Sequence, residues 1–269
     1  MAVPDVPHSD FSAPLSVQRV VRCLPADLEA TRSTLDRVQA SPAGKDLNYL
    51  DRLICKPWGS EFRVYEDART DVWCLHVAAQ QRTSLHCHPE KLTSQLCMEG
   101  KGTLTTISGV RYALEPGVVV HIQPGAYHRI AATSTTGLRL IEVERPKNKF
   151  DLLRIEDDYR DVTQPYEGEQ QAALGLITND RTNTVPLALQ PLVDLRLGAN
   201  RRARLRAHCS TGRYGFSVES AEHVRATMNV VYAVALEPHA TASREITVLG
   251  PDRAVSADPL TVYLTIRVL

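Results

Sequence analysis

The sequence has no net charge and no long hydrophobic run. Its 269 residues carry 31 Lys and Arg against 31 Asp and Glu, and the sequence pI is about 7.1. A chain without an excess of one charge has no overall attraction for a polyanion, so binding to nucleic acid or to an anionic membrane would need a local basic patch. No apolar run approaches the roughly 18–20 residues that cross a bilayer. Neither nucleic acid nor a membrane is therefore expected as a partner.

The sequence also lacks a secretory signal and a cysteine framework. The first residues, Met1–Asp5, show no basic segment followed by an apolar one. The six cysteines form no CxxC pair and have no regular spacing, which argues against a zinc ribbon and against a set of disulfides. Both features predict a cytoplasmic protein with reduced thiols.

What is present fits an ordinary globular chain. With 43% hydrophobic and 23% charged residues the protein can build a core, and its length allows one elaborated domain or two. Apolar spacing from Leu28 through Leu35 to Val38 predicts one amphipathic helix of about four turns over Pro25–Ala40. Beyond this helix, short runs between turn residues predict antiparallel strands.

The predicted fold class is all-β: an antiparallel barrel or sandwich with an N-terminal helix and a second, smaller C-terminal β unit. The expected parts are an N-terminal arm and helix (1–50), the main β unit (51–160), a polar connector (161–184) and the C-terminal β unit (185–269). The strands expected in the two β units are Glu61–Tyr65, Val72–Ala78, Ser94–Met98, Gly102–Ile107, Val118–Ile122 and Leu138–Glu142, then Pro191–Leu197, Arg202–His208, Gly215–Val218, Met228–Glu237, Glu245–Leu249 and Leu260–Val268.

Two histidines, His86 and His88, stand in the most informative stretch of the sequence. Side chains two residues apart on a strand point to the same side, so the two imidazoles can share one metal ion. A third, His128, follows a Pro-Gly turn that would lead a strand back across the same barrel. Three imidazoles facing into a small barrel suit a divalent ion, with Zn, Fe, Mn and Ni as candidates. The predicted metal ligands are therefore His86, His88 and His128.

The spacing of these histidines resembles the motifs of the cupin superfamily. The first motif has the form His-x-His, and the second runs from Gly117 through Pro124-Gly125 to His128. Further matches resemble more closely the cupin of type II phosphomannose isomerases, which is also the C-terminal domain of mannose-1-phosphate guanylyltransferases. The resemblance covers about residues 55–160 and implies a jelly-roll cupin barrel at 51–160. The further matches are Lys56-Pro57-Trp58-Gly59, Ser84-Leu85, Glu99-Gly100, Leu140-Ile141-Glu142-Val143 and Ile155-Glu156-Asp157-Asp158-Tyr159.

One position departs from that family. In the family pattern a glutamate five residues after the second histidine is the fourth protein ligand, and in this chain Thr93 stands there. A neutral hydroxyl is a poor ligand for a divalent ion. The expected site therefore has three histidines, with Glu90, Gln95 or His121 as substitute ligands if the loop shifts its register. The loss of one carboxylate should weaken metal binding.

Three further residues are candidates for catalysis. Glu90 and Lys91 follow the ligands and could act as a general base and as an anchor for a phosphate, although such a charged pair is also typical of an exposed turn. His121 could be a base, a ligand or a core histidine. The four arginines from Arg201 to Arg206 alternate in part with apolar residues, which favours a solvated strand face over a phosphate or RNA site.

Three functions from different classes fit these residues. The resemblance implies a metal-dependent enzyme that acts on a sugar phosphate or a related small hydroxylated metabolite, in an isomerase-like reaction. A three-histidine Fe(II) site with open positions would instead suit a dioxygenase. A cupin without the fourth ligand could also be a non-catalytic module for ligand binding or assembly. The expected partners are a small-molecule substrate and, as one possible assembly, a second copy in a homodimer.

Overall fold

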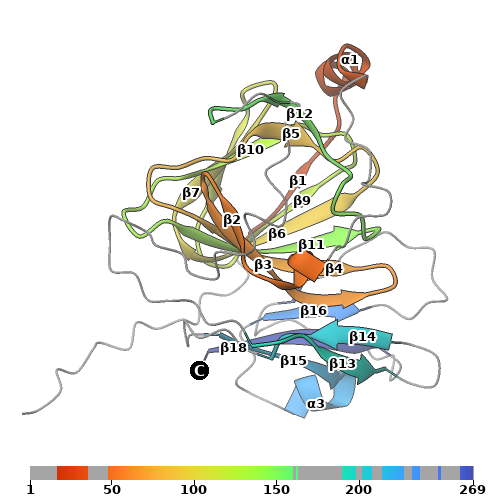
Figure 1. Cartoon of the computed structure of the whole chain (residues 1–269). Coiled ribbons are helices and arrows are strands. Elements are labelled where there is room, and N and C mark those ends of the chain that lie inside the picture. Colours follow the sequence, from red (N-terminus) through yellow and green to blue (C-terminus); the bar gives the residue numbers. More distant parts are fainter. Residues whose placement is uncertain are drawn as a thin grey trace, which may run out of the picture.

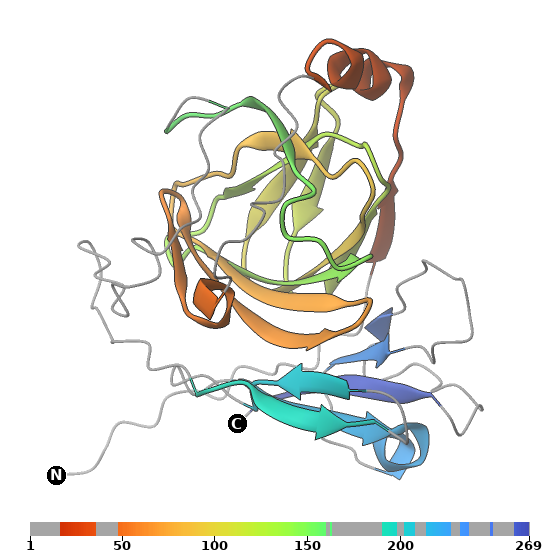
Figure 2. The same cartoon turned by 45° about the vertical axis from the view of Figure 1, so that its right-hand side comes forward.

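Three β-sheets contain most of the residues that the structure describes. The structure is a computed structural model, and it describes residues 17–35, 48–159, 162, 190–197, 202–207, 214–226, 232–236, 248–249 and 261–268. Two sheets face each other as a barrel, and the third lies against the outside of that barrel (Figure 1 and Figure 2).

The barrel consists of a nine-stranded and a five-stranded sheet. The larger runs in the order β1 (Val17–Val21), β9 (Val118–Ile122), β6 (Leu92–Gly100), β11 (Leu138–Arg145), β4 (Asp71–Val77), β3 (Gly59–Asp67), β14 (Arg202–Leu205) and β13 (Val193–Arg196), with β2 (Ile54–Lys56) also paired to β3. The smaller runs in the order β12 (Leu153–Glu156), β5 (Leu85–Cys87), β10 (His128–Ala132), β7 (Gly102–Thr106) and β8 (Arg111–Leu114).

The third sheet comes from the C-terminal part of the chain. Its order is β15 (Tyr214–Ser220), β18 (Val262–Val268), β16 (Tyr232–Leu236) and β17 (Val248–Leu249). The described helices are α1 (Pro25–Arg32), the short 3-10 helix η2 (Asn48–Asp51) and α3 (Ala221–Ala226).

An apolar cluster fills one part of the barrel, between its two sheets. Trp73 and Leu75 of β4 and Leu140 of β11 pack there with Leu104 of β7 and Ile130 of β10. These side chains alternate along their strands with residues of the opposite face, as the period of two requires. The two sheets therefore share one core.

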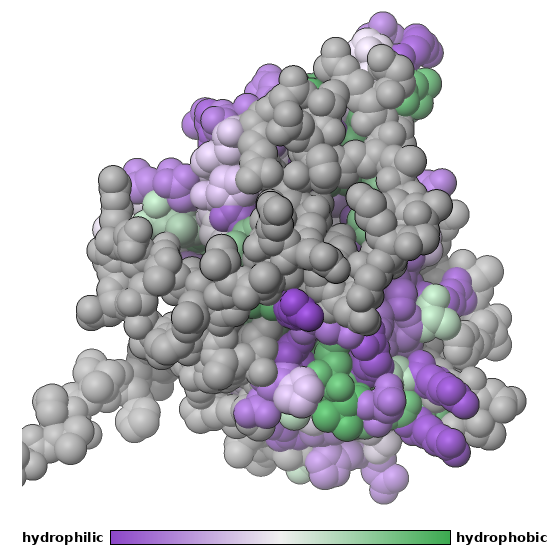
Figure 3. All heavy atoms as spheres, in the orientation of Figure 1, coloured by the Kyte–Doolittle hydropathy of each residue, from purple (hydrophilic) through white to green (hydrophobic). Residues whose placement is uncertain are grey.

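The third sheet covers the outer face of the nine-stranded sheet. Phe62 and Val64 of β3 belong to one buried cluster with Phe216 of β15, Val234 of β16 and Leu264 of β18. The apolar faces of these two sheets are turned toward each other, which leaves the central strands buried on both sides. In the space-filling view, the coloured part of this side of the molecule is mostly hydrophilic, with a small hydrophobic patch in its lower part (Figure 3).

The all-β fold class is confirmed, with a helix before the barrel and a further sheet after it. Every strand range expected from the sequence overlaps an observed strand. The structure adds β1, β2, β8 and β12, together with β5 and β10, which carry two of the histidines. After the connector, β13 and β14 join the barrel sheet through β3, while β15 to β18 form the third sheet. The proposed domain division stays a prediction, because residues 163–189 lie outside the described residues.

The N-terminal helix differs from its prediction in length and in its packed face. Helix α1 ends at Arg32, and residues 36–40 of the expected helix lie outside the described residues. Leu28 and Leu35 are 58% and 59% exposed, so the predicted apolar face is wrong. The buried residue is Asp27, whose carboxylate accepts hydrogen bonds from the backbone N–H of Leu24 and of Tyr127. A polar cap, rather than an apolar stripe, attaches this helix to the barrel.

The arginine-rich strand is not a solvated face. Arg202 is exposed, but Arg204 is half-buried and its guanidinium contacts both Asp51 and Glu66. Arg206 is 1% exposed and donates hydrogen bonds to the backbone carbonyls of Arg63 and Asp51. The prediction was wrong because β14 pairs with β3, which brings acidic residues and carbonyl groups to these side chains.

Within the described part of the chain, no helix combines the length and the apolar character that crossing a membrane requires.

Candidate metal centre

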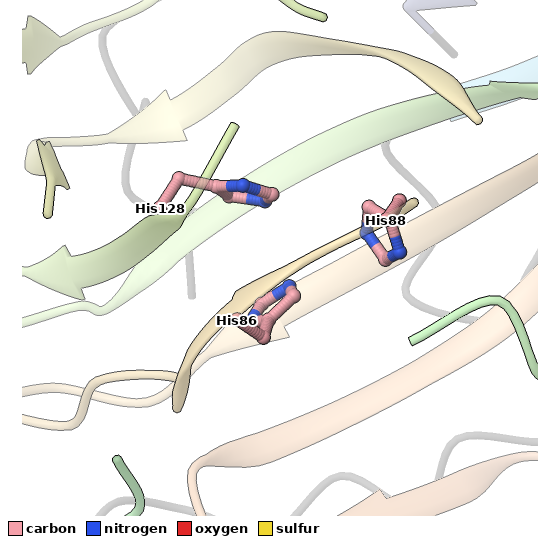
Figure 4. Close-up of side chains that lie close together, drawn as sticks. All are labelled: His86, His88 and His128. Carbon is pink, nitrogen blue, oxygen red and sulfur yellow. The ribbon is translucent and has the colours of Figure 1, made fainter. Parts of the chain in front are cut away.

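Two neighbouring strands bring the three predicted ligands together. His86 of β5 stands directly opposite His128 of β10, and His88 follows the end of β5. The ring centroids are 4.5 Å apart for His86 and His128, 5.2 Å for His86 and His88, and 5.6 Å for His88 and His128. The rings approach a common point from the two strands (Figure 4). One nitrogen from each ring lies within 4.8 Å of the other two, as a shared metal ion would need.

Backbone carbonyl groups fix the orientation of all three rings. The Nδ1 atoms lie 2.9 Å from the carbonyl oxygen of Ser84 for His86, 2.7 Å from that of Asp151 for His88, and 3.1 Å from that of Ala126 for His128. A carbonyl oxygen can only accept, so each Nδ1 carries the proton and each Nε2 keeps its lone pair. This is the arrangement typical of metal-bound histidine.

The Nε2 atoms of two of these rings are buried without a hydrogen-bond partner. They belong to His88 and His128, which are 7% and 1% exposed. A buried polar atom without a partner is costly unless something binds there. The orphaned nitrogen atoms and the closeness of the rings therefore fit a bound metal ion.

Burial favours the neutral form of all three imidazoles. Burial lowers the pKa of His128 to about 4. Burial also lowers the pKa of His86 and of His88 well below the ordinary value, with the neighbouring rings adding to the effect at His86 and Lys91 adding to it at His88. Because metal binding competes with protonation, these low pKa values keep the lone pairs available.

Thr93, at the departure from the family pattern, does face the barrel interior. It is fully buried on β6, its Oγ1 has no hydrogen-bond partner, and it stands opposite Glu144 of β11. Of the suggested substitute ligands, Glu90 is exposed. His121 lies on the same side of β9 as Val119, which packs in the cluster on the outer face of the sheet. Its Nδ1 is 2.7 Å from the hydroxyl of Ser94. The described cluster of closely spaced ligand atoms consists of the three histidines.

A cavity of about 60 Å³ lies at the histidines. Since one water molecule needs roughly 10–15 Å³ on this measure, the cavity has room for several small polar groups beside the rings. Its lining combines four basic and three acidic side chains with a smaller set of apolar ones. The charged members are Lys56, Lys91, Lys149, Arg154, Glu61, Glu142 and Glu144.

Of the three predicted catalytic residues, only Lys91 lines this cavity. Its side chain is 1% exposed, and its Nζ lies 2.8 Å from Oε1 of Glu144. The loop that carries it is held by Asp151, whose carboxylate accepts the backbone N–H of Glu90 and of Lys91. The structure does not bring Glu90 and His121 to the cavity lining.

The sequence analysis missed the other charged residues of the cavity. Lys149 lies 2.7 Å from Oε1 of Glu61, and its Nζ is 3.9 Å from the centre of the ring of Trp73. Lys56 approaches the same carboxylate oxygen at 3.3 Å. Alternation of charged and apolar residues was the available signal, but it does not tell which face of a strand meets the interior.

A second group missed from the sequence is a pair of carboxyl groups on β11. Glu142 and Glu144 are two residues apart, line the same cavity and are 7% and 1% exposed. The side-chain amide of Gln95 donates to Glu142, whereas Lys91 donates to Glu144. One carboxyl group thus has a neutral donor and the other a charged one.

A comparison with protein families finds a match within the barrel. Residues 73–144 match the family model described as a cupin domain. The match runs from β4 to β11 and includes all three histidines. The expected cupin resemblance is therefore confirmed for this part of the chain. No curated protein matches the sequence.

Several solved structures are similar to parts of the chain. An uncharacterized conserved protein with a double-stranded β-helix domain from Klebsiella pneumoniae is 18% identical, with a TM-score of 0.34, over 46% of this chain and 90% of its own. The capsular polysaccharide assembling protein CapF from Staphylococcus aureus is 20% identical, with a TM-score of 0.36, over 39% of this chain and 34% of its own. KdgF from Halomonas sp. is 16% identical, with a TM-score of 0.34, over 38% of this chain and 94% of its own.

Proposed function

We propose that this chain, whose barrel is a cupin domain, is a metal-dependent enzyme acting on a sugar phosphate or a related small hydroxylated metabolite, in an isomerase-like reaction. The observation that carries the proposal is the convergence of three neutral imidazoles in a cavity that also holds buried acidic and basic groups. Buried polar groups of this kind cost stability and are typical of sites that bind and convert small molecules.

His86, His88 and His128 would hold the metal ion through their Nε2 atoms. A divalent ion at such a site polarises a carbonyl and an adjacent hydroxyl group of a substrate. Three protein ligands leave coordination positions for substrate oxygen atoms. The chain's own contribution is to orient the rings through the carbonyl groups of Ser84, Ala126 and Asp151 and to keep them neutral.

The basic residues of the cavity support an anionic substrate. Lys56, Lys149 and Arg154 line it together with the histidines, and their side chains are largely withdrawn from solvent. Lys56 and Lys149 share the single carboxylate of Glu61, which leaves positive charge there for a phosphate or carboxylate group to balance. Lys91, which the sequence suggested as the anchor, is bonded to Glu144, so its role in the proposal is to hold that carboxylate.

The likeness to type II phosphomannose isomerases is part of the proposal, as are the identity of the metal, a cytoplasmic location and a homodimer. Glu90 and His121 are left out of the proposed chemistry, because the first is exposed and the second lies away from the cavity. The further sequence matches, Lys56–Gly59, Leu140–Val143 and Ile155–Tyr159, are what favours the isomerase over other cupin activities.

A dioxygenase is the second candidate. The described ligand cluster contains three nitrogen donors and no carboxylate, and such a set leaves open positions for dioxygen and a bidentate substrate on iron. A non-catalytic ligand-binding or assembly cupin remains the third.

The test loads separate samples with Zn, Mn, Ni or Fe(II) and incubates each with a panel of aldose and ketose phosphates and hydroxy acids. Isomerisation is followed by NMR, and oxygen uptake is recorded with the iron sample. The proposal expects interconversion of a sugar phosphate without oxygen uptake, and none with His128→Ala. Oxygen-dependent turnover would favour the dioxygenase, and metal binding without any turnover would favour the non-catalytic module.

A further inference from the structure

The carboxyl groups of Glu142 and Glu144 form an asymmetric pair inside the cavity. Both side chains leave the inner face of β11, two residues apart, and both are almost fully buried. They line the cavity that the imidazoles of His86, His88 and His128 also line. Any small molecule held at the histidines would therefore share its cavity with this pair.

The neighbours of the pair favour negative charge on one member only. Lys91 Nζ lies 2.8 Å from Oε1 of Glu144, and both of these side chains are 1% exposed. Glu142 instead receives a neutral N–H from Gln95 of β6. Two ionised carboxylates side by side in a buried site repel each other strongly, so one proton is expected on the pair.

Two further charged side chains act on the pair without reversing this assignment. Lys149, from the loop after β11, attracts both carboxylates, and Asp71 of β4 lies close enough to Glu144 for their charges to repel. Burial and the charge of Glu144 raise the pKa of Glu142 to about 8. Burial alone would raise the pKa of Glu144 too, but Lys91 and Lys149 outweigh it and lower that pKa.

We propose that Glu142 and Glu144 hold a single proton at neutral pH, that Glu142 carries it, and that Glu142 exchanges this proton with the ligand bound at the three histidines. Glu144 is then a positioning residue, which keeps the proton on its neighbour. In the first transfer the O–H bond of Glu142 breaks and a substrate oxygen gains the proton. In the second transfer the carboxylate of Glu142 takes one proton back from the substrate. The pair therefore ends with one proton, as it began.

This inference rests on the proposed function for its substrate, but its central claim concerns the protein alone. A protonated carboxyl group has a carbonyl stretching band in the infrared that the carboxylate lacks. Metal-free protein with ¹³C-labelled glutamate would be titrated from pH 5 to pH 10. The band expected for Glu142 persists at pH 7, disappears with a midpoint near pH 8 and is absent in Glu142→Gln.

Two variants sharpen the assignment. Glu144→Gln removes the repelling charge, so the midpoint of the band should move to lower pH, whereas Glu90→Gln changes an exposed residue outside the cavity and should leave the midpoint unchanged. Asp71, whose pKa burial raises to about 6, carries no glutamate label and does not interfere.

The wild-type titration decides the matter even if a variant fails to fold. No glutamate carbonyl band above pH 6.5, or a band that persists in Glu142→Gln, would overturn the inference. Zinc binding, measured after zinc is added to the same preparations, tests the proposed function separately. A protein that shows the band but binds no zinc would contradict the proposed function and leave the protonation of Glu142 supported.

Discussion

The two faces of β11 differ: one packs in the apolar core, and the other lines the cavity of the candidate site. Ile141 and Val143 point outward and are 1% and 0% exposed within the apolar cluster that the barrel shares with the third sheet. Glu142 and Glu144 point inward, to the cavity. In an isolated barrel the apolar face would be expected inside. Here the outer face supplies much of the packing, which leaves one part of the interior for charged groups.

The interior itself is also divided along this strand. Leu138 and Leu140 pack in the apolar cluster of the barrel, while Glu142 and Glu144 follow on the same face. The change from leucine to glutamate marks the boundary between the core of the barrel and its cavity. Substitutions on the two faces should therefore affect different properties.

The largest effect is expected from a charge on the outer face. Val143→Asp would place an unpaired carboxylate between two sheets at a fully buried position, which should cost more than about 3 kcal/mol of unfolding free energy. Urea unfolding followed by circular dichroism measures this. Ile141→Val, which keeps the apolar character of the same face, is the control and should cost less than about 1.5 kcal/mol. A folded Val143→Asp variant of wild-type stability would show that the third sheet does not cover this face.

The next effect is expected inside the barrel, where a buried ion pair loses one partner. Lys91→Met leaves the carboxylate of Glu144 without its ammonium group, and the expected loss of stability is about 3–5 kcal/mol. The double variant Lys91→Met with Glu144→Leu removes both charges and should recover most of that loss. If the single and double variants lose the same stability, the two side chains do not interact.

The histidine site could be predicted from the sequence because its signal is local. His86 and His88 are two residues apart at the end of one strand, and the turn before His128 belongs to a motif of fixed spacing. Glu142 and Glu144 gave no such signal, since alternation with Ile141 and Val143 equally describes a strand with a solvated face. Which face is inside depends on residues far along the chain, such as Val234 and Leu264, that cover the other one.

The same limit explains the two errors in the fold. Leu28 and Leu35 have helical spacing, yet both are exposed, and α1 is attached to the barrel through the carboxylate of Asp27. This carboxylate binds the backbone N–H of Tyr127, and a contact with a distant backbone group leaves no pattern in the sequence. Arg206 is buried because β14 adds to β3, a pairing between residues more than a hundred positions apart. Local patterns predicted where the strands lie along the chain. Which residues cover each face of an element depends on contacts with distant parts of the chain, and local patterns do not show these contacts.

A smaller effect, on metal affinity rather than stability, is expected at the departure from the family pattern. Thr93→Glu would add a carboxylate to the inner face of β6, and zinc should bind at least about tenfold more tightly, which is ~1.4 kcal/mol. Calorimetric titration with zinc measures this, and Thr93→Gln, similar in size but neutral, should give a much smaller gain. Unchanged affinity in Thr93→Glu would mean that residue 93 does not face the metal.

The central claim is that the inward-facing histidines bind one metal ion, and the most direct measurement compares two histidine variants after equilibrium dialysis against zinc. His88→Ala removes a ring whose buried Nε2 has no partner, while His121→Ala removes a ring that lies away from the cavity and contacts Ser94. The account predicts one zinc ion per chain by elemental analysis in the wild type and in His121→Ala, and at least a tenfold lower content in folded His88→Ala. Equal zinc content in the two variants would contradict it.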